Sequence, residues 1–475
     1  MITFLVALAA LIIGYIVYGA IVEKIFKPDD RITPAMAHPD GVDYIPIKGW
    51  RAFLIQLLNI AGLGPIFGAL SGAIWGPSVY LWIVLGTIFA GATHDYLAGM
   101  LSLRHDGASI SEVTGIYLGN GMRQVMRVFS VILLVMVGVV FMVGPAGLIA
   151  LLTPESLNIK FWTIVILIYY FLATLLPIDK IIGKLYPLFG ICLILMAVGV
   201  GAATLLHNGT RPMMELTLQN LHPQGKPIWP LMFITVACGA ISGFHATQSP
   251  MIARTLTHEK EGRRIFYGAM VAEGIIALIW ASAGIAFYYT TDGGLINLLE
   301  KGGGNSAVVY EMSMTLLGPI GGALAMIGVI ACPITSGDTA FRSARLTIAD
   351  WFKLDQSNVK IRLTLSAILL GVGYLISKID YQVVWRYFSW SNQTLAMIAL
   401  WACSVYLVKY HKPIYSLITV IPAIFMSTVC VTYILIAPEG FKLSTSIGYP
   451  IGFAAAALFT VLFIMKSLKV IKENK

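Results

Sequence analysis

The chain has 475 residues, of which 58% are hydrophobic and only 12% are charged. A soluble protein carries roughly twice that charged fraction, so the composition excludes a chain of two or three soluble domains with polar surfaces. The net charge of +9 suits a membrane protein, in which Lys and Arg collect in cytoplasmic loops, and no nucleic acid is expected as a partner.

Apolar runs of about 20 residues recur along the whole length, and each is long enough to cross a hydrocarbon core roughly 30 Å thick. The sequence therefore predicts an all-α polytopic protein of the lipid bilayer with about 13 transmembrane helices. These segments are 2–22, 50–76, 78–103, 124–152, 160–177, 185–206, 229–253, 264–290, 312–340, 361–378, 383–408, 413–436 and 448–467.

The first segment has no basic residues before it and is followed at once by Glu23, Lys24 and Lys27, which predicts a retained N-terminal transmembrane helix rather than a cleaved signal peptide. In the loop that follows, Asp29-Asp30-Arg31 is interpreted as a solvated, locally paired turn.

The basic residues predict the orientation of the chain. With the N-terminus outside, 25 of the 32 Lys and Arg fall on one side of the membrane and 7 on the other. Because the basic side is the cytoplasmic one, we expect a multi-pass protein of the inner (plasma) membrane. Its N-terminus lies outside and its C-terminus in the cytoplasm.

Two segments are interrupted near their middle. The segment 50–76 contains Gly62-Leu63-Gly64-Pro65, and the segment 229–253 contains Gly239, Gly243 and Pro250 around a polar stretch. Gly and Pro free backbone groups from helical hydrogen bonds, and such backbone is tolerated at membrane depth only where it is buried in protein or lines a cavity. Both breaks therefore predict a solute pathway. The alternative is close helix packing, for which Gly is common in membrane helices and for which Gly68 and Gly72 are suitably spaced.

Each break opens a block of five helices, and an odd number gives the two blocks opposite orientations. Paired interrupted helices in corresponding positions of two halves are typical of an inverted-repeat transporter. The predicted organisation, in chain order, is an N-terminal helix (1–22), a cytoplasmic loop (23–49), a first five-helix repeat (50–206), an extracytoplasmic loop (207–228), a second inverted five-helix repeat (229–408) and two C-terminal helices with a basic tail (409–475).

After each break, the N-terminus of the second half-helix points into the membrane. Two such ends offer unpaired N–H groups and positive dipole ends to one central space, which suits a carboxylate. The predicted substrate-binding residues are Asn59, Gly62, Gly64, Pro65, Ser242, Gly243, Phe244, His245 and Gln248. A neutral packing histidine is the alternative for His245.

Ionisable groups inside a bilayer are costly and are functional candidates. Asp95 follows His94, but adjacent residues on a helix point about 100° apart, so the two are not automatically a pair. Asp95 is a candidate ion-coupling residue, or else it bridges to a neighbouring helix. Glu273 has no basic residue within one helical turn. Burial without a cation favours the neutral carboxyl, so Glu273 is a candidate proton carrier, or else it bonds a backbone carbonyl.

The segment 312–340 ends in Thr335-Ser336-Gly337-Asp338-Thr339, whose hydroxyls and carboxylate share a helix face. Thr335, Ser336, Asp338 and Thr339 are therefore predicted to bind the coupling cation, since a hard cation prefers oxygen ligands. The alternative is an ordinary pair between Asp338 and Arg342, four residues apart. The sequence leaves open whether the coupling cation is H⁺ or Na⁺.

Several polar blocks resemble the carbon starvation protein A (CstA) family. These blocks are Gly14-Tyr15 with Tyr18-Gly19, 27–35 (KPDDRITPA), 40–44 (DGVDY), 56–66 (QLLNIAGLGPI), Gly91 with His94-Asp95-Tyr96, and 335–342 (TSGDTAFR). The resemblance implies uptake of peptides or pyruvate during carbon starvation, as a stress response. It also implies a LeuT-like (APC-type) five-plus-five fold, here with one extra N-terminal and two extra C-terminal helices.

We therefore predict a secondary active transporter that imports a small carboxylate-bearing solute by cation-coupled alternating access, and not an enzyme. The five cysteines lie in apolar segments without a CxxC pair, so neither disulfides, a metal site nor a cofactor is expected, and no protein partner is predicted. The alternatives are a membrane-embedded metal-dependent enzyme, which needs more than the one acidic pair Asp29-Asp30, and a channel, which generally needs several subunits around a pore.

Overall fold

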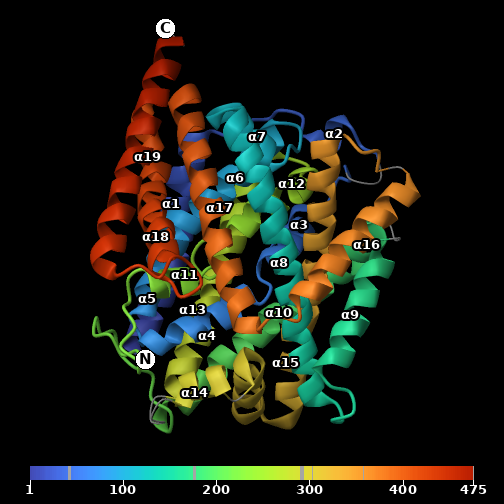
Figure 1. Ribbon diagram of the computed structural model, residues 1–475, viewed down its shortest axis with the longest axis vertical. Helices are drawn as coiled ribbons and strands as arrows, with labels where there is room; N and C mark the ends of the chain where they lie inside the picture. The colour runs from blue at the N-terminus through green and yellow to red at the C-terminus, as the bar shows by residue number, and fades with distance from the viewer. Residues whose placement is uncertain (41–43, 175–177, 289–293, 302, 357, 474–475) are drawn as a thin grey trace.

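The computed structural model describes residues 1–475 except 41–43, 175–177, 289–293, 302, 357 and 474–475. The secondary structure of the described residues is helical, with no strand beyond one isolated bridge between Ile47 and Leu256. Most of the long helices run roughly along the long axis of the molecule, whereas α16 crosses obliquely (Figure 1). Helices α2 and α7 lie toward the upper end and α14 toward the lower end. The two termini lie toward opposite ends.

The first half of the chain contains the following helices: α1 Ile2–Phe26, α2 Pro34–Ala37, α3 Gly49–Ile60, η1 Gly64–Gly68, α4 Ala69–Gly72, η2 Ala73–Trp75, α5 Val79–Leu81, η3 Trp82–Gly91, α6 Ala92–Arg104, α7 Ile110–Leu118, α8 Asn120–Leu152, α9 Ile159–Ala173, α10 Ile178–Leu206 and η4 His207–Gly209.

The second half contains α11 Leu231–Thr235, α12 Gly243–Ala253, η5 Glu259–Glu261, η6 Arg263–Tyr267, α13 Gly268–Tyr288, α14 Gly294–Lys301, α15 Gly304–Phe352, α16 Val359–Ile376, α17 Tyr381–Tyr410, η7 Pro413–Ser416, α18 Leu417–Ile436 and α19 Thr445–Glu473.

Within the described residues, ten helices are long and apolar enough to cross a membrane, or eleven if the bent pair of α3 and the helix after it counts as one span. Two of the thirteen predicted segments are not among these helices. The segment 160–177 appears as α9, which has 15 residues, and the segment 229–253 is divided between α11 and α12. The ends of segments 160–177 and 264–290, and part of the DGVDY block, lie outside the described residues.

The structure confirms the break in the first interrupted segment. Helix α3 ends at Ile60, and the next helical turn begins at Gly64 with Pro65 in its first turn. The axis bends there by 53°. Gly64 is required by packing, because a Cβ atom at this position would lie 2.1 Å from the Cβ of Cys238 in the second break. The two breaks therefore contact one another.

The second break is also confirmed. Helix α11 ends at Thr235 and α12 begins at Gly243, with an extended Ser242 before it. A Cβ atom on Gly243 would lie 2.4 Å from the backbone oxygen of Asn392 in α17. The start of α12 is thus pressed against the middle of α17, and only glycine permits that approach.

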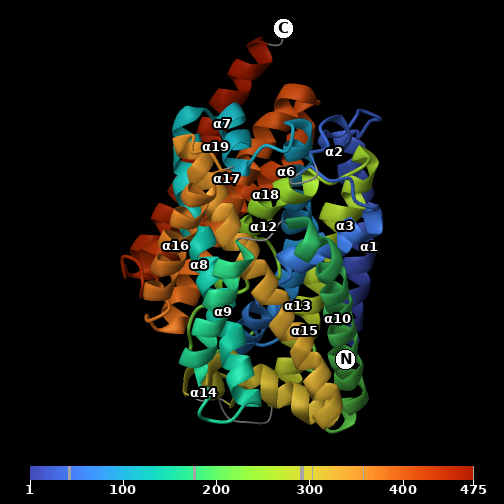
Figure 2. The same cartoon turned by 90° about the vertical axis from the view of Figure 1, so that its right-hand side faces the viewer.

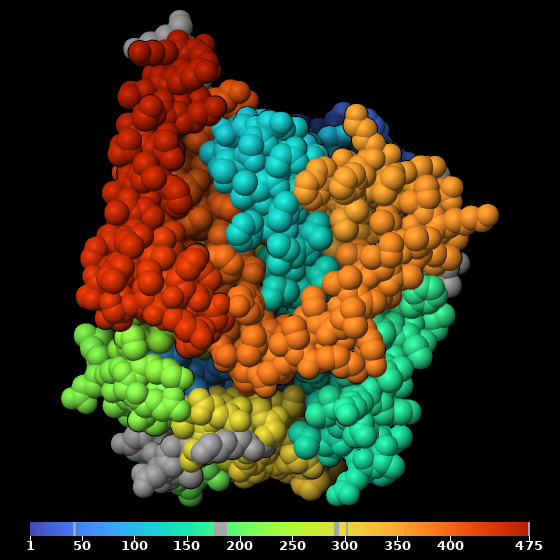
Figure 3. All heavy atoms as spheres, viewed as in Figure 1, coloured from blue at the N-terminus to red at the C-terminus, as the bar shows by residue number. Residues whose placement is uncertain are grey.

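Burial separates central from peripheral helices. In the most apolar 18-residue stretch, every residue of α17 is buried, but only 17% of those of α19 are. Helix α19 covers one outer edge (Figure 3), with exposed apolar side chains such as Phe453 and Leu462, as a lipid-facing helix requires. Helix α15 packs between α8 and α10 (Figure 2).

Candidate functional site

A histidine from the second broken helix meets two carboxyl groups from neighbouring helices. The Nδ1 atom of His245 in α12 lies 2.7 Å from Oδ2 of Asp95 in α6. The Nε2 atom lies 3.2 Å from Oε2 of Glu273 in α13. All three side chains are fully buried. We call Asp95, His245 and Glu273 the His245 triad.

The two contacts of His245 differ in kind. The Asp95 contact is a hydrogen bond, whereas the Glu273 contact lacks hydrogen-bond geometry, and neither Glu273 oxygen has a hydrogen-bond partner among the described residues. An imidazole that donates Nδ1–H to one carboxylate presents Nε2 to the other. The triad can therefore hold a proton between Nε2 and Glu273.

His94 adds a second imidazole to Asp95. Its Nδ1 lies 2.8 Å from Oδ1 of Asp95, so one carboxylate bonds two histidines. Adjacency in the sequence does not predict this pair, because the Cβ atoms of neighbouring residues diverge along a helix. A hydrogen bond needs only that the ring nitrogen and the carboxylate oxygen converge, and here they do.

Cys238 lies beside the triad. Its Sγ, a His245 nitrogen and a Glu273 oxygen lie within 4.8 Å of one another, and these residue types can hold a transition metal. The thiol, however, already contacts Oγ of Ser242 at 3.6 Å and Nδ2 of Asn392 at 3.4 Å. The expectation that no metal binds stays a prediction.

The first turn of α12 has a hydrogen-bond partner that the sequence reasoning missed. The side-chain oxygen of Asn392 in α17 accepts hydrogen bonds from the backbone N–H of Phe244 (2.7 Å) and from the hydroxyl of Ser242 (3.1 Å). The neighbouring Gln393 donates to the backbone oxygen of Phe233 at 2.6 Å. The polar run Ser391-Asn392-Gln393-Thr394 within an apolar segment was the signal for both.

The break after α3 has its carbonyls bonded by α15. Ser336 donates its hydroxyl to the oxygen of Leu58 (2.9 Å), and the Cys332 thiol lies 3.2 Å from the oxygen of Ala61. Cys332 was not a predicted site residue. A sulfur atom in an apolar segment carries no sequence signal for such a contact.

The other residues of the predicted cation site make side-chain contacts within α15, whereas Ser336 contacts the break after α3. Thr335 and Thr339 hydrogen-bond the backbone oxygens of Cys332 (2.7 Å) and Ser336 (2.9 Å) in their own helix. Asp338 lies 3.6 Å from Nη2 of Arg342, which is the helix-face pair that the spacing allowed.

Three buried amide side chains near the breaks have unused hydrogen-bonding atoms. Both polar atoms of Gln56 and Asn59 in α3, and the side-chain oxygen of Gln248 in α12, lack a partner among the described residues. An unsatisfied buried polar atom costs about 1–3 kcal/mol, so these amides suit contact with a polar solute. Asn59 and Gln248 were predicted site residues, whereas Gln56, one turn before Asn59, was not.

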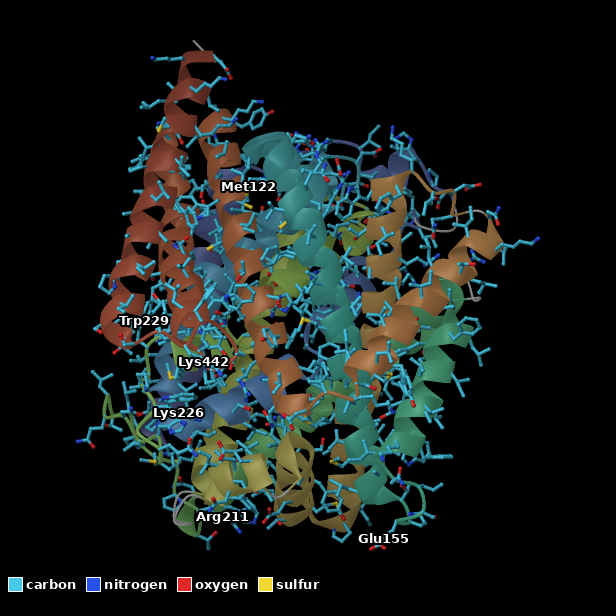
Figure 4. The ribbon with its side chains drawn as sticks, viewed as in Figure 1. Met122, Glu155, Arg211, Lys226, Trp229 and Lys442 are labelled. Carbon is cyan, nitrogen blue, oxygen red and sulfur yellow. The ribbon has the colours of Figure 1, made fainter. Side chains whose placement is uncertain are left out.

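A cavity of about 580 Å³ reaches toward the breaks from the lower part of the molecule. Its lining includes Ser71, Thr235, Trp385 and Ser389, and its charged residues are Lys226, Glu300, Arg386 and Glu439. Lys226 lies on the lower left of Figure 4, where Figure 3 shows a hollow between the green, yellow and red segments. We call this cavity the vestibule.

The opposite end is closed by charged residues. The Glu259 carboxylate is fully buried and accepts hydrogen bonds from Nε (2.7 Å) and Nη2 (3.2 Å) of Arg104 and from the backbone N–H of Asp29 (2.6 Å). Arg104 also donates to the hydroxyl of Tyr406 at 2.6 Å. These contacts join the segment after α1 to α6, to η5 and to α17. We call them the Arg104 network.

The predicted turn at Asp29 forms part of this closure. Asp29 and Arg31 form an ion pair of 2.7 Å, which confirms the local pairing. The Arg31 guanidinium holds the pKa of the Asp29 carboxyl well below its usual range. Lys260 lies 2.7 Å from Asp30 and lowers the pKa of that carboxyl as well.

Comparison with known proteins gives consistent results. The protein family described as carbon starvation protein CstA matches this chain over residues 1–146, 148–298 and 299–433. An uncharacterized membrane protein of Haemophilus influenzae is 43% identical over 61% of this chain and 91% of its own length. The peptide transporter CstA of Campylobacter jejuni is 25% identical, over 88% of this chain and 78% of its own.

The pyruvate/proton symporter BtsT of Escherichia coli is 25% identical over 87% of this chain and 78% of its own length. Among solved structures, a mutant manganese transporter of Eremococcus coleocola superposes with a TM-score of 0.58 at 11% identity, covering 92% of this chain and 99% of that one. This similarity shows a shared fold. The relatives with named activities are transporters, not enzymes.

Proposed function

The chain belongs to the carbon starvation protein CstA family, and from this premise we propose that it is a proton-coupled importer of a small carboxylate-bearing nutrient, a peptide or pyruvate. That it is a multi-pass membrane transporter and not an enzyme follows from its relatives and its apolar helices. The solute, the coupling ion and the transport cycle are the proposed parts. The observation that carries them is the His245 triad beside the start of α12.

The triad supports a proton as the coupling ion. Two carboxyl groups and an imidazole in contact, all buried, cannot each keep its charge at low cost in a membrane interior. Gain or loss of one proton changes the net charge of the triad by one. The triad includes His245 in the first turn of α12, so protonation alters the field at the predicted carboxylate site.

The break after α3 argues against sodium. A sodium site between α15 and this break would use the freed carbonyls as ligands, but Ser336 and Cys332 already donate to those of Leu58 and Ala61. Each of these carbonyl oxygens has two lone pairs and already accepts one hydrogen bond, so less of its acceptor capacity is left for a sodium ion. The proton is therefore the simpler partner for this chain.

Alternating access is supported by the difference between the two ends. The vestibule is open at the lower end and extends to Thr235 and Ser389 beside the second break, whereas the Arg104 network holds the other end closed. In the predicted orientation, with the N-terminus outside, this is an outward-open state of a five-plus-five inverted repeat in the inner membrane.

The test is uptake of labelled pyruvate and of a dipeptide into proteoliposomes under separately imposed H⁺ and Na⁺ gradients. Accumulation above equilibrium with an inward proton gradient, and none with a sodium gradient, is the expected result. Uptake that stops at equilibrium under both gradients would indicate a channel. Accumulation driven by sodium alone would contradict the role given to the triad.

A further inference from the structure

One face of α17 lines the vestibule with hydrogen-bond donors. Its lining residues are Gln382, Trp385, Arg386 and Ser389, whose spacing places them on one side of the helix. An amide, an indole N–H, a guanidinium and a hydroxyl therefore share one cavity, and each of them can donate. A solute that enters the vestibule meets these groups before it reaches the breaks.

The Trp385 end of this face lies against both breaks. A Cβ atom on Gly68, in the turn that follows the first break, would lie 3.8 Å from Cζ2 of Trp385. It would also lie 3.2 Å from the backbone oxygen of Thr235, where α11 ends. The ring centroids of Trp385 and Phe67 in η1 are 6.0 Å apart. The inner end of the vestibule is thus the place where the two broken helices meet.

Two of the donors are buried and lack a partner. Trp385 and Ser389 are 3% and 1% exposed, and neither the indole Nε1 nor the hydroxyl Oγ has a hydrogen-bond partner among the described residues. Buried polar atoms without a partner cost free energy, and an indole N–H can only donate. A ligand for this place must therefore bring an acceptor, which a carboxylate does and an ammonium group does not.

Arg386 adds a positive charge to these donors. Its Nε lies 3.2 Å from Oε2 of Glu439, and Glu439 also accepts from the hydroxyl of Tyr433. The two Nη groups carry the other four N–H donors of the guanidinium, and the Arg386 side chain is 42% exposed. These donors can bond a second carboxylate while Glu439 keeps Nε, and such charge-assisted bonds are roughly twice as strong as neutral ones.

We infer that the inner end of the vestibule is a carboxylate-binding subsite, in which Arg386, Trp385 and Ser389 hold an incoming solute before it moves to the breaks. The inference rests on the proposed function and names the group of the solute that is recognised first. A neutral analogue without the carboxylate loses the bonds to the guanidinium, and so it is held more weakly.

The main test separates this role from that of a structural ion pair. Arg386→Gln removes the guanidinium, so the KM for pyruvate or the dipeptide, whichever is taken up, rises by about tenfold. The maximal rate changes little, because the His245 triad is intact. The substitution also leaves Glu439 buried without its counter-charge, so the double variant Arg386→Gln/Glu439→Gln removes both charges. A subsite keeps the KM of the double variant raised. A purely structural pair returns that KM to the wild-type value, and this result would overturn the inference.

Ser389→Ala measures the buried donors independently. The hydroxyl has no partner among the described residues, so the melting temperature in detergent stays near that of the wild type. The KM rises by about threefold, because one hydrogen bond to the solute is lost. An unchanged KM would show that the subsite as inferred is wrong. If Arg386→Gln does not fold, Ser389→Ala and the double variant decide.

The matched control is Lys442→Gln. Lys442 is an exposed cation (Figure 4) three residues after Glu439 and lies outside the lining of the vestibule. The same loss of one positive charge is therefore made near the subsite but not in it, and the KM stays at the wild-type value. A rise equal to that of the double variant would mean that surface charge sets the KM, and the inference would fall.

Binding of the labelled solute to the detergent-solubilised protein at equal pH, without any gradient, separates the two proposals. The wild type binds, and the double variant binds about tenfold more weakly. If the wild type accumulates the solute and the double variant binds it as tightly, the inference fails and the proposed function stands. If the wild type neither binds nor takes up pyruvate or a dipeptide, the proposed function fails, and the inference fails with it.

Discussion

Arg104 and Glu259 form a two-bonded ion pair that joins the end of α6 to the segment between α12 and α13, with N–O distances of 2.7 and 3.2 Å. Glu259 is fully buried and the Arg104 side chain is 13% exposed. The guanidinium also lies over the ring of Phe26 at 3.9 Å. This pair closes the end of the molecule opposite the vestibule.

We predict that Glu259→Gln destabilises this closed end. Removal of one partner leaves Arg104 buried without its counter-charge, which costs about 3–5 kcal/mol for a buried pair. The melting temperature in detergent should fall, and the proton-driven uptake rate should fall with it, because the outward-open state loses its closure.

The control for this prediction is Glu261→Gln two residues away. Glu261 pairs with Arg264 at 3.2 Å, but the Arg264 side chain is 54% exposed, so the pair contributes about 1 kcal/mol or less. Equal losses in the two variants would show that the Arg104 network has no special role in closure.

Glu215 anchors the start of α1 and gives a pH-dependent prediction. Its carboxylate accepts from the N-terminal ammonium (2.7 Å) and from the N–H of Ile2 and Thr3, and these hydrogen bonds lower its pKa from 4.5 to about 2. A lowered folded-state pKa gives stability that is present above the unfolded pKa of 4.5 and is lost as the pH falls toward 2.

Wild-type protein should therefore be slightly more stable than Glu215→Gln at pH 7, and the difference should vanish as the pH is lowered from 5 to 2. The side chain is 53% exposed, so the difference at pH 7 is about 1 kcal/mol at most. Thermal melting of both proteins across this pH range measures it. A difference that grows on acidification would contradict the assignment.

Asp338 and Glu273 are both buried carboxyl groups, and we predict different roles for them. Asp338 pairs with Arg342 in its own helix at 3.6 Å. Asp338→Asn should lower thermal stability because it leaves Arg342 without a counter-charge, but uptake should still follow the proton gradient in the protein that remains folded. Loss of proton dependence in Asp338→Asn would move the coupling site to α15.

Local chemistry explains which of these features could be predicted. The breaks at Gly62–Pro65 and around Gly243 follow from residues next to one another in the sequence, since Gly and Pro act on their own backbone. The His245 triad does not, because Asp95 and His245 are 150 residues apart and only tertiary packing brings their helices together. Asp95, His245 and Glu273 were each predicted as candidates, but never as one cluster.

The contacts of α17 and α15 with the breaks were harder to predict. Asn392 lies in the polar run 391–394 of the apolar segment 383–408, and this run was its signal in the sequence. Its partners, Phe244 and Ser242, lie about 150 residues earlier in the chain. Cys332 gave no signal, because a thiol in an apolar helix is ordinary, and its role at the break is visible only in the structure.

The last prediction concerns Glu273. Its oxygens have no hydrogen-bond partner among the described residues, and Nε2 of His245 is 3.2 Å away. A proton at this place can therefore be held by the Glu273 carboxylate or by the imidazole. Glu273→Gln keeps the size of the side chain but cannot gain or lose a proton. Accumulation driven by a proton gradient should therefore be lost.

Exchange of labelled for unlabelled substrate at equal pH should persist in Glu273→Gln, because exchange needs the substrate site and the movement of the helices but no net proton transfer. The control is Glu155→Gln at the exposed lower end of the molecule (Figure 4), which should keep both activities. Loss of accumulation and exchange together would mean that Glu273 supports binding or folding. Retention of proton-driven accumulation would exclude Glu273 as the coupling group.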